Sequence, residues 1–165
     1  MKNNALIILI IGLAVYFFMK RQKIETNISG INDDYDSLFV KYGKMFRVNP
    51  RLMKSIAANE SYLGQYGGLE PIGGTRGLMH IKLSTAQDHE ADLTEYSLYD
   101  SPAATENQVR VATKHMKHLL SLFGGDEKKA VQAYNAGEGN IKKGRIPSTT
   151  VAYWDRYQRN FERLG

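Results

Sequence analysis

The sequence has no cysteine among its 165 residues, which excludes disulfide bonds and membrane attachment through a lipidated cysteine. It also has no internal repeat and no low-complexity tract. Hydrophobic residues make up 42% of the chain, which excludes a fibrous or disordered protein, and the mean hydropathy of −0.40 excludes a protein with several membrane spans. A chain of this length predicts about one folded domain.

Little net charge remains once the N-terminus is set aside. The formal charge is +5, but Lys2, Lys20, Arg21 and Lys23 all precede the first acidic residue. The other 18 of the 22 basic residues lie from Ile24 onward, together with all 17 acidic residues. The main body is therefore nearly neutral, which argues against a nucleic-acid-binding protein.

The charged N-terminal residues flank one uncharged apolar run, residues 5–19. As a helix these 15 positions would span roughly 22 Å, less than the ~30 Å hydrocarbon core, so the flanking polar residues would have to extend the span. Lys20 and Arg21 follow the run where a signal peptidase needs small residues, which favours an uncleaved anchor over a signal peptide. We expect a membrane anchor at 1–23, a linker at 24–33 and a catalytic domain at 34–165.

The domain is predicted to be mainly α. Apolar residues recur at helical spacing, and Asn49, Ser84, Ser101, Asp126 and Ser148 are suitable helix-start residues. The expected helices are 34–48, 50–61, 85–92, 101–123, 127–136 and 148–161, and the fifth of them should end at a left-handed Gly137. Four of these helices have a predicted inward face. These faces are Leu38, Tyr42, Met45 and Phe46 in the first helix; Leu52, Met53, Ile56 and Ala57 in the second; Val109, Ala112, Met116, Leu119 and Leu120 in the fourth; and Val151, Tyr153, Trp154, Tyr157 and Phe161 in the last. Glycines and a proline between Gly64 and Gly77 predict an irregular loop or a small β excursion.

Glu60 is the most informative carboxylate. It follows Ile56 by four residues and Ala57 by three, so it should lie on the buried side of a helix end, just before the glycine-rich loop. Burial and the negative end of the helix dipole both raise the pKa of such a carboxyl. A carboxyl that stays protonated near neutral pH can act as a general acid. Position alone leaves open an ordinary helix-end glutamate.

Three sequence blocks surround this residue in order: Ala58–Ser61 (ANES), Gly77–Ile81 (GLMHI) and Ala133–Gly137 (AYNAG). Thr150 and Tyr153 form a weaker fourth match. Together the blocks resemble the signatures of the lytic transglycosylase SLT family, which is goose-lysozyme-like. The resemblance extends over about 34–161, nearly the whole predicted domain.

The resemblance implies a lysozyme-like α fold with a cleft for the glycan strands of peptidoglycan. Glu60 matches the family's single acid and base, which protonates the glycosidic oxygen between N-acetylmuramic acid and N-acetylglucosamine. The same group then takes the proton of the muramoyl C6 hydroxyl as that oxygen closes on C1, which gives a 1,6-anhydromuramoyl end. This chemistry needs no water nucleophile, second carboxylate, cofactor or metal.

Other matched residues receive binding roles from the resemblance. Ser61 would hydrogen-bond Glu60 or the intermediate, and Met79 would line the cleft wall with the backbone of 77–81. Tyr134 and Asn135 would hold Glu60 and the sugar N-acetyl groups, and Tyr153 would cover the cleft. The alternatives are core packing for Met79 and Tyr153 and a simple helix-end position for Ser61.

Two positions depart from the family pattern. His80 stands where the family usually has glutamine, and an imidazole also offers a donor and an acceptor but gains charge near pH 6 to 7. Thr149 stands where a glutamate often precedes the threonine. We therefore expect His80 to bind substrate with a steeper pH dependence.

The two histidines His115 and His118 raise the question of a metal site. Two histidines three residues apart, without cysteine or a nearby carboxylate, more often form a solvated helix face. The sequence therefore predicts no metal ligands here.

The leading hypothesis is a membrane-anchored lytic transglycosylase whose catalytic domain faces the cell wall. A muramidase of the same fold and a non-catalytic glycan-binding or structural protein remain alternatives. Three positive residues follow the apolar run and only Lys2 precedes it, so the positive-inside rule would place the domain in the cytoplasm. Delivery from a bacteriophage virion membrane, or release on lysis, would remove this conflict, so we favour a phage setting.

Overall fold

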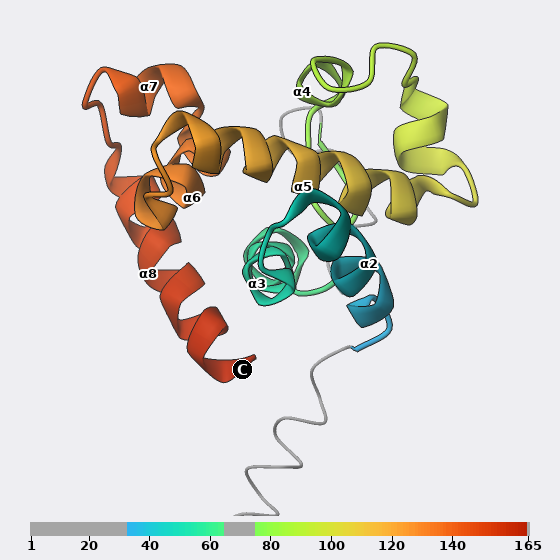
Figure 1. The fold of residues 1–165 in the computed structure, drawn as a ribbon, viewed down its shortest axis with the longest axis horizontal. Helices are drawn as coiled ribbons and strands as arrows, with labels where there is room; N and C mark the ends of the chain where they lie inside the picture. The colour runs from blue at the N-terminus through green and yellow to red at the C-terminus, as the bar shows by residue number, and fades with distance from the viewer. Residues whose placement is uncertain (1–32, 65–74, 165) are drawn as a thin grey trace, which may run out of the picture. The chain divides into compact units, whose positions relative to one another are not determined.

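The computed structural model describes residues 33–64 and 75–164, which belong to one compact unit of the chain, Asp33–Gly165. The expected anchor at 1–23, most of the linker at 24–33 and most of the glycine-rich segment lie outside the described residues. Within the described ranges no helix is both long and apolar enough to cross a membrane. The same residues form a mainly α domain, as predicted (Figure 1).

Helices α2 (Asp36–Phe46) and α3 (Pro50–Ser61) form a packed pair. The Asn49 side chain accepts a hydrogen bond from the backbone N–H of Arg51, and Pro50 occupies the first turn, so α3 begins where the sequence predicts. Its expected core face is confirmed, because Leu52, Met53, Ile56 and Ala57 are all buried. Lys54, which is largely covered, forms ion pairs with Asp33 and Asp36.

The predicted inward face of α2 is partly wrong. Phe39, Tyr42 and Gly43 are buried, whereas Met45 is 59% exposed. The reason is the close approach of α2 to the start of α3, because a Cβ on Gly43 would lie 2.8 Å from both the Pro50 side chain and the Val48 carbonyl. The face that carries Gly43 therefore turns inward, and Met45 turns out.

The long helix α5 (Ala104–Leu122) packs against α2 and crosses above α3 in Figure 1. Val109, Ala112, Met116 and Leu119 are buried as predicted, while Leu120 is only half-buried. The helix begins three residues after Ser101. The Ser101 carbonyl accepts a hydrogen bond from the Ala104 N–H, so Ser101 belongs to the turn that precedes the helix.

The segment before α5 differs most from the prediction. Helix α4 is Leu83–Gln87 rather than 85–92, and its N-cap is Lys82 rather than Ser84. A π-helix, η1 (Tyr96–Asp100), follows and was not predicted. Mutual hydrogen bonds between Thr94 and Ser97 open this turn, and it packs against α5. Its unusual hydrogen-bond pattern thus depends on local hydroxyls and on tertiary packing.

The C-terminal helices are α6 (Glu127–Ala136), α7 (Glu138–Lys142) and α8 (Ser148–Arg163). Asp126 caps α6 through the Lys129 N–H, as expected. Gly137 has φ 83° but ψ 140°, so it is not the predicted left-handed cap, and the chain continues directly into the unpredicted α7. Helix α8 packs on both α3 and α6, which brings its residues to the end of α3.

The buried residues of α8 are Thr150, Tyr153 and Tyr157, while Val151 is 46% exposed. The prediction that Val151 faces inward is therefore wrong. The Thr150 hydroxyl donates to the Asn135 side-chain oxygen at 2.9 Å, and this polar contact turns Thr150 toward α6 in place of Val151.

Candidate active site

Glu60 lies in the last turn of α3, as the sequence predicts. The buried stripe of α3 carries it inward, and left-handed backbone at Tyr62 and Leu63 ends the helix immediately afterwards. Only 16% of its side chain is exposed. The carboxyl therefore lies at the floor of a cleft rather than on a solvated helix end.

Burial raises the pKa of Glu60 to about 7. A hydrogen bond from Tyr153 and the positive charge of Arg156 act in the opposite direction and moderate that pKa. The balance leaves a carboxyl that is partly protonated and partly ionised at neutral pH. Such a group can give up a proton and take one back under the same conditions.

Tyr153 is the direct partner of this carboxyl. Its hydroxyl donates to Glu60 Oε1 at 2.6 Å, and its side chain is almost fully buried in α8. Asn59 fixes the Tyr153 backbone, because Asn59 Nδ2 donates to the Tyr153 carbonyl at 3.0 Å. Asn160 in turn donates to Asn59 Oδ1 at 2.7 Å. The α3–α8 contact therefore holds the tyrosine against Glu60 instead of letting it serve only as a cover for the cleft.

His80 approaches the other oxygen of the same carboxyl. Its Nδ1 lies 3.7 Å from Glu60 Oε2, and 16% of its side chain is exposed. Burial lowers the pKa of His80, so the ring is neutral at pH 7. The backbone of His80 has φ 44°, a left-handed conformation that is uncommon outside glycine, and in this conformation the imidazole approaches the carboxyl.

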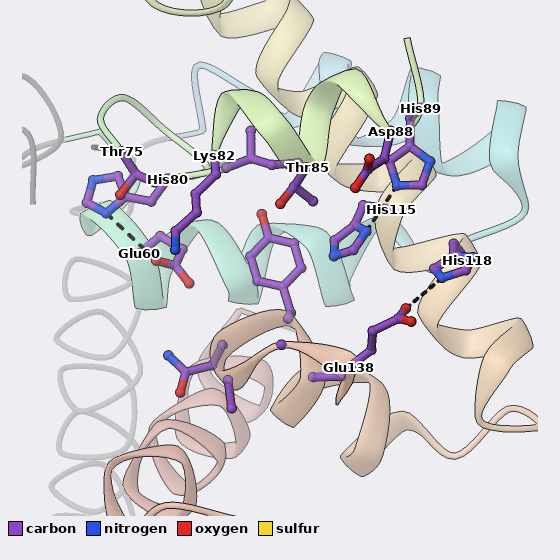
Figure 2. Close-up of a pocket in the computed structure, with 16 residues that line it drawn as sticks. Glu60, Thr75, His80, Lys82, Thr85, Asp88, His89, His115, His118 and Glu138 are labelled. Atoms are coloured by element: carbon purple, nitrogen blue, oxygen red, sulfur yellow. Dashed lines mark hydrogen bonds and ion pairs between the residues drawn. The ribbon is translucent and has the colours of Figure 1, made fainter. Parts of the chain in front are cut away.

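A cleft of about 890 Å³ extends from Glu60 between two walls (Figure 2). One wall comes from residues 80–89 and the other from residues 133–138, while His115 and His118 of α5 close the far end. Tyr134 and Asn135 line the cleft as the resemblance implies. The Tyr134 hydroxyl donates to the Met79 carbonyl at 2.9 Å, so it supports the opposite wall rather than Glu60.

Two of the expected binding residues lie behind the cleft surface. The Ser61 hydroxyl donates to the Leu78 carbonyl at 2.8 Å and accepts from the Gly64 N–H at 2.9 Å, so its hydrogen bonds go to backbone and not to Glu60. Met79 is fully buried and is a core residue. The expectation that Met79 lines the cleft wall is therefore corrected to core packing, because its apolar side chain is fully buried, and the Ser61 hydroxyl is engaged by the backbone of residues 64 and 78.

The expected solvated face at His115 and His118 is also wrong for His115. His89 joins them at the same end of the cleft, with Nε2 3.0 Å from His115 Nδ1, and burial lowers the pKa of His115 to about 4. His118 contacts the Glu138 carboxylate at 2.8 Å. Among residues 33–64 and 75–164, no three His, Cys, Asp or Glu side chains are placed to hold a metal ion.

Several residues of this site carry too weak a sequence signal to be predicted. His89 and Asp88 lie in a turn whose position depends on the short α4. Gln108 did carry a signal, because a polar residue four positions after Ala104 and four before Ala112 interrupts the apolar stripe of α5. It is 2% exposed and contacts the loop that carries His80.

The substitution Tyr153→Phe should raise the pKa of Glu60 further, by about one pH unit, because it removes a hydrogen bond that favours the ionised carboxyl. Carboxyl ¹³C NMR titration measures this change without any assay of activity. Tyr157→Phe is the matched control, since Tyr157 on the same helix donates to Glu127 at 2.8 Å, away from Glu60. An unchanged Glu60 titration in Tyr153→Phe would contradict the assigned hydrogen bond.

Comparison with known proteins agrees with this architecture. The family model described as the transglycosylase SLT domain matches residues 37–154. The peptidoglycan transglycosylase gp16 of Escherichia phage T7 is 31% identical over 111 residues, which cover 67% of this chain and 8% of that protein. This chain therefore spans a small part of its phage relative.

Two solved structures share the fold. The lytic transglycosylase Slt of Pseudomonas aeruginosa, solved as an inactive mutant with glutamine in place of a glutamate, superposes with a TM-score of 0.61 at 15% identity. The 70 kDa soluble lytic transglycosylase SLT70 of Escherichia coli gives a TM-score of 0.56 at 21% identity. Each match covers 81% of this chain and 22% or 23% of the larger protein. The predicted lysozyme-like fold is thus confirmed, and the chain belongs to the transglycosylase SLT domain family.

Proposed function

We propose that this domain cleaves the glycan strands of peptidoglycan as a lytic transglycosylase, with Glu60 as its only acid and base. The observation that carries the proposal is a buried carboxyl of pKa about 7 at the floor of a cleft. The family match and the names of the phage and bacterial relatives support the same substrate and reaction.

The reaction begins with Glu60 protonated. Its proton passes to the oxygen of the glycosidic bond between N-acetylmuramic acid and N-acetylglucosamine, and the bond from that oxygen to the muramoyl C1 breaks. Glu60, now ionised, accepts the proton of the muramoyl C6 hydroxyl as the C6 oxygen bonds to C1. The carboxyl returns to its starting state, and no water is consumed.

The residues around Glu60 suit both halves of this cycle. Burial favours the protonated acid that starts the reaction, and the Tyr153 hydroxyl stabilises the carboxylate that appears midway. Tyr153 occupies Oε1, while Oε2 lies nearer to His80 and accepts no hydrogen bond from Tyr153. We assign proton transfer to Oε2 and substrate contacts to His80, Tyr134 and Asn135.

The arrangement of the other cleft carboxylates favours the lyase over a muramidase. A glycosidase with two carboxyl groups places them on either side of the scissile bond, about 5 to 10 Å apart. In the described part of this cleft, Asp88 and Glu138 lie at the end opposite to Glu60, beside the histidines (Figure 2). Glu138 is also engaged by His118 and Lys142.

We further propose that residues 5–19 anchor the protein in a membrane and that the domain acts on the cell wall from a phage virion or during lysis. The uncharged apolar run and its basic flank support the anchor. The phage relative supports the setting. On this proposal residues 1–23 are the anchor, 24–33 the linker and 34–165 the catalytic domain.

The test is the pH dependence of cell-wall digestion by the full chain. We expect digestion of purified peptidoglycan, with kcat/KM falling about tenfold per pH unit above pH 7 as Glu60 loses its proton. Clearing of a turbid cell-wall suspension measures the rate. A protein that binds the walls without clearing them would instead be the non-catalytic glycan-binding alternative.

A further inference from the structure

The loop that carries His80, residues 77–81, is held in place by side chains from other parts of the domain. It belongs to no helix or strand, so its backbone groups lack regular partners. Ser61 donates to the Leu78 carbonyl, Tyr134 to the Met79 carbonyl and Tyr99 to the Ile81 carbonyl, at 2.8, 2.9 and 2.7 Å. In each of these hydrogen bonds the loop provides the carbonyl acceptor, so the buried N–H groups of the loop need acceptors from elsewhere.

Gln108 supplies the acceptor for one of those N–H groups. Its Oε1 accepts from the Met79 N–H at 3.1 Å, and its Nε2 donates to the Leu98 carbonyl of η1 at 3.0 Å. The side chain is 2% exposed, so neither hydrogen bond can be replaced easily by solvent. One carboxamide therefore links α5, η1 and the loop.

The loop also packs directly on this carboxamide. A Cβ on Gly77 would lie 2.2 Å from Gln108 Nε2 and 2.6 Å from Oε1, a distance at which the two groups overlap. Gly77 has φ 84°, a conformation that glycine adopts without strain. The approach and the hydrogen bond together fix the loop on both sides of Leu78.

The consequence reaches Glu60 through His80, the residue directly after Met79. His80 keeps a left-handed backbone and lies 3.7 Å from the Glu60 carboxyl. A shift of the Met79 peptide would move the imidazole and admit water to a carboxyl whose pKa is raised by burial. The position of the 77–81 loop therefore affects the pKa of Glu60 through Met79 and His80.

We propose that Gln108 is a positioning residue of the active site, which holds the 77–81 loop so that His80 covers the Glu60 carboxyl. This inference rests on the proposed function only for its effect on turnover. Gln108 touches neither the cleft nor Glu60, and it acts through Met79 and His80.

The experiment replaces Gln108 by methionine in the full chain, which keeps the length of the side chain and removes both hydrogen bonds. We expect kcat on soluble glycan strands to fall about 10- to 100-fold. We also expect Glu60 to titrate at a lower pH than in the wild type, closer to an ordinary carboxyl, in a ¹³C NMR titration that needs no turnover.

Asn107→Leu is the matched control. Asn107 is the neighbouring amide on α5 and also donates to η1, at the Ser97 carbonyl, while its side-chain oxygen accepts from Arg110, so these hydrogen bonds do not involve the 77–81 loop. It should lower the melting temperature and leave both the Glu60 titration and kcat unchanged. Equal changes in the two variants, or an unchanged titration in Gln108→Met, would overturn the inference.

A conservative variant keeps the proposal testable if Gln108→Met does not fold. In Gln108→Glu, a protonated carboxyl reproduces the donor and the acceptor, and an ionised one loses the donor toward Leu98. Its kcat should approach the wild-type value at acid pH and fall more steeply than wild type as pH rises. A pH profile parallel to wild type would contradict the assigned role. If the wild type cleaves no glycan, the proposed function fails, while the Glu60 titration still tests the position of the loop.

Discussion

Glu60→Gln should abolish the cleavage of glycan strands, with a loss of about 10²- to 10⁴-fold in kcat. Glutamine keeps the shape of the side chain and its ability to accept a hydrogen bond from Tyr153 Oη. It has no proton to give to the glycosidic oxygen and no carboxylate to accept one from the C6 hydroxyl. Both halves of the proposed reaction therefore fail together, while binding of the strand persists.

The fold of this variant can be verified through the pH dependence of its stability. The pKa of Glu60 is raised on folding, from 4.5 to about 7, so the folded wild type binds more protons than the unfolded chain between these values. Wild-type stability therefore falls as pH rises through this window, and Glu60→Gln lacks this loss. Relative to wild type, the variant should gain about 3 kcal/mol between pH 4 and pH 8.

Glu138→Gln provides the matched control for activity. Glu138 lines the far end of the same cleft, so its substitution removes a carboxylate without removing the proposed acid. We expect the rate of wall digestion to change by less than about threefold. Loss of activity in both variants would point to a pair of acting carboxylates, as in a muramidase, and would contradict the single-acid mechanism.

The sequence predicts α3 and its acid well because the relevant signals are local. Asn49 and Pro50 define the first turn, and the apolar stripe of α3 sets the direction of Glu60. The raised pKa follows from the same stripe, because burial is its principal cause. A helix with clear caps and one buried face needs little tertiary information.

Predictions failed where contacts between distant segments decide which face turns inward. The close approach at Gly43 sets the rotation of α2, and the hydrogen bond from Thr150 to Asn135 sets that of α8. A hydrophobic pattern alone does not distinguish Met45 from Phe39 as the inward residue. The short α4, η1 and α7 likewise depend on turn geometry rather than on periodicity.

The sequence predicts which residues form the site better than it predicts the role of each residue. The four blocks identify Glu60, His80, Tyr134, Asn135 and Tyr153, and the structure brings all of them to one cleft or its floor. Ser61 instead supports the loop, and Met79 enters the core. The loop that carries Met79 also has left-handed backbone at His80, and single residues of positive φ are hard to anticipate outside glycine.

The nature of the product tests the central claim most directly. Purified peptidoglycan is digested with the full chain, and the released muropeptides are analysed by mass spectrometry, with a muramidase digest as reference. Internal attack by the C6 hydroxyl predicts 1,6-anhydromuramoyl ends, so each product should be lighter by one water molecule than its muramidase counterpart. Products with reducing ends and the full muramidase mass would show attack by water and contradict the lyase mechanism.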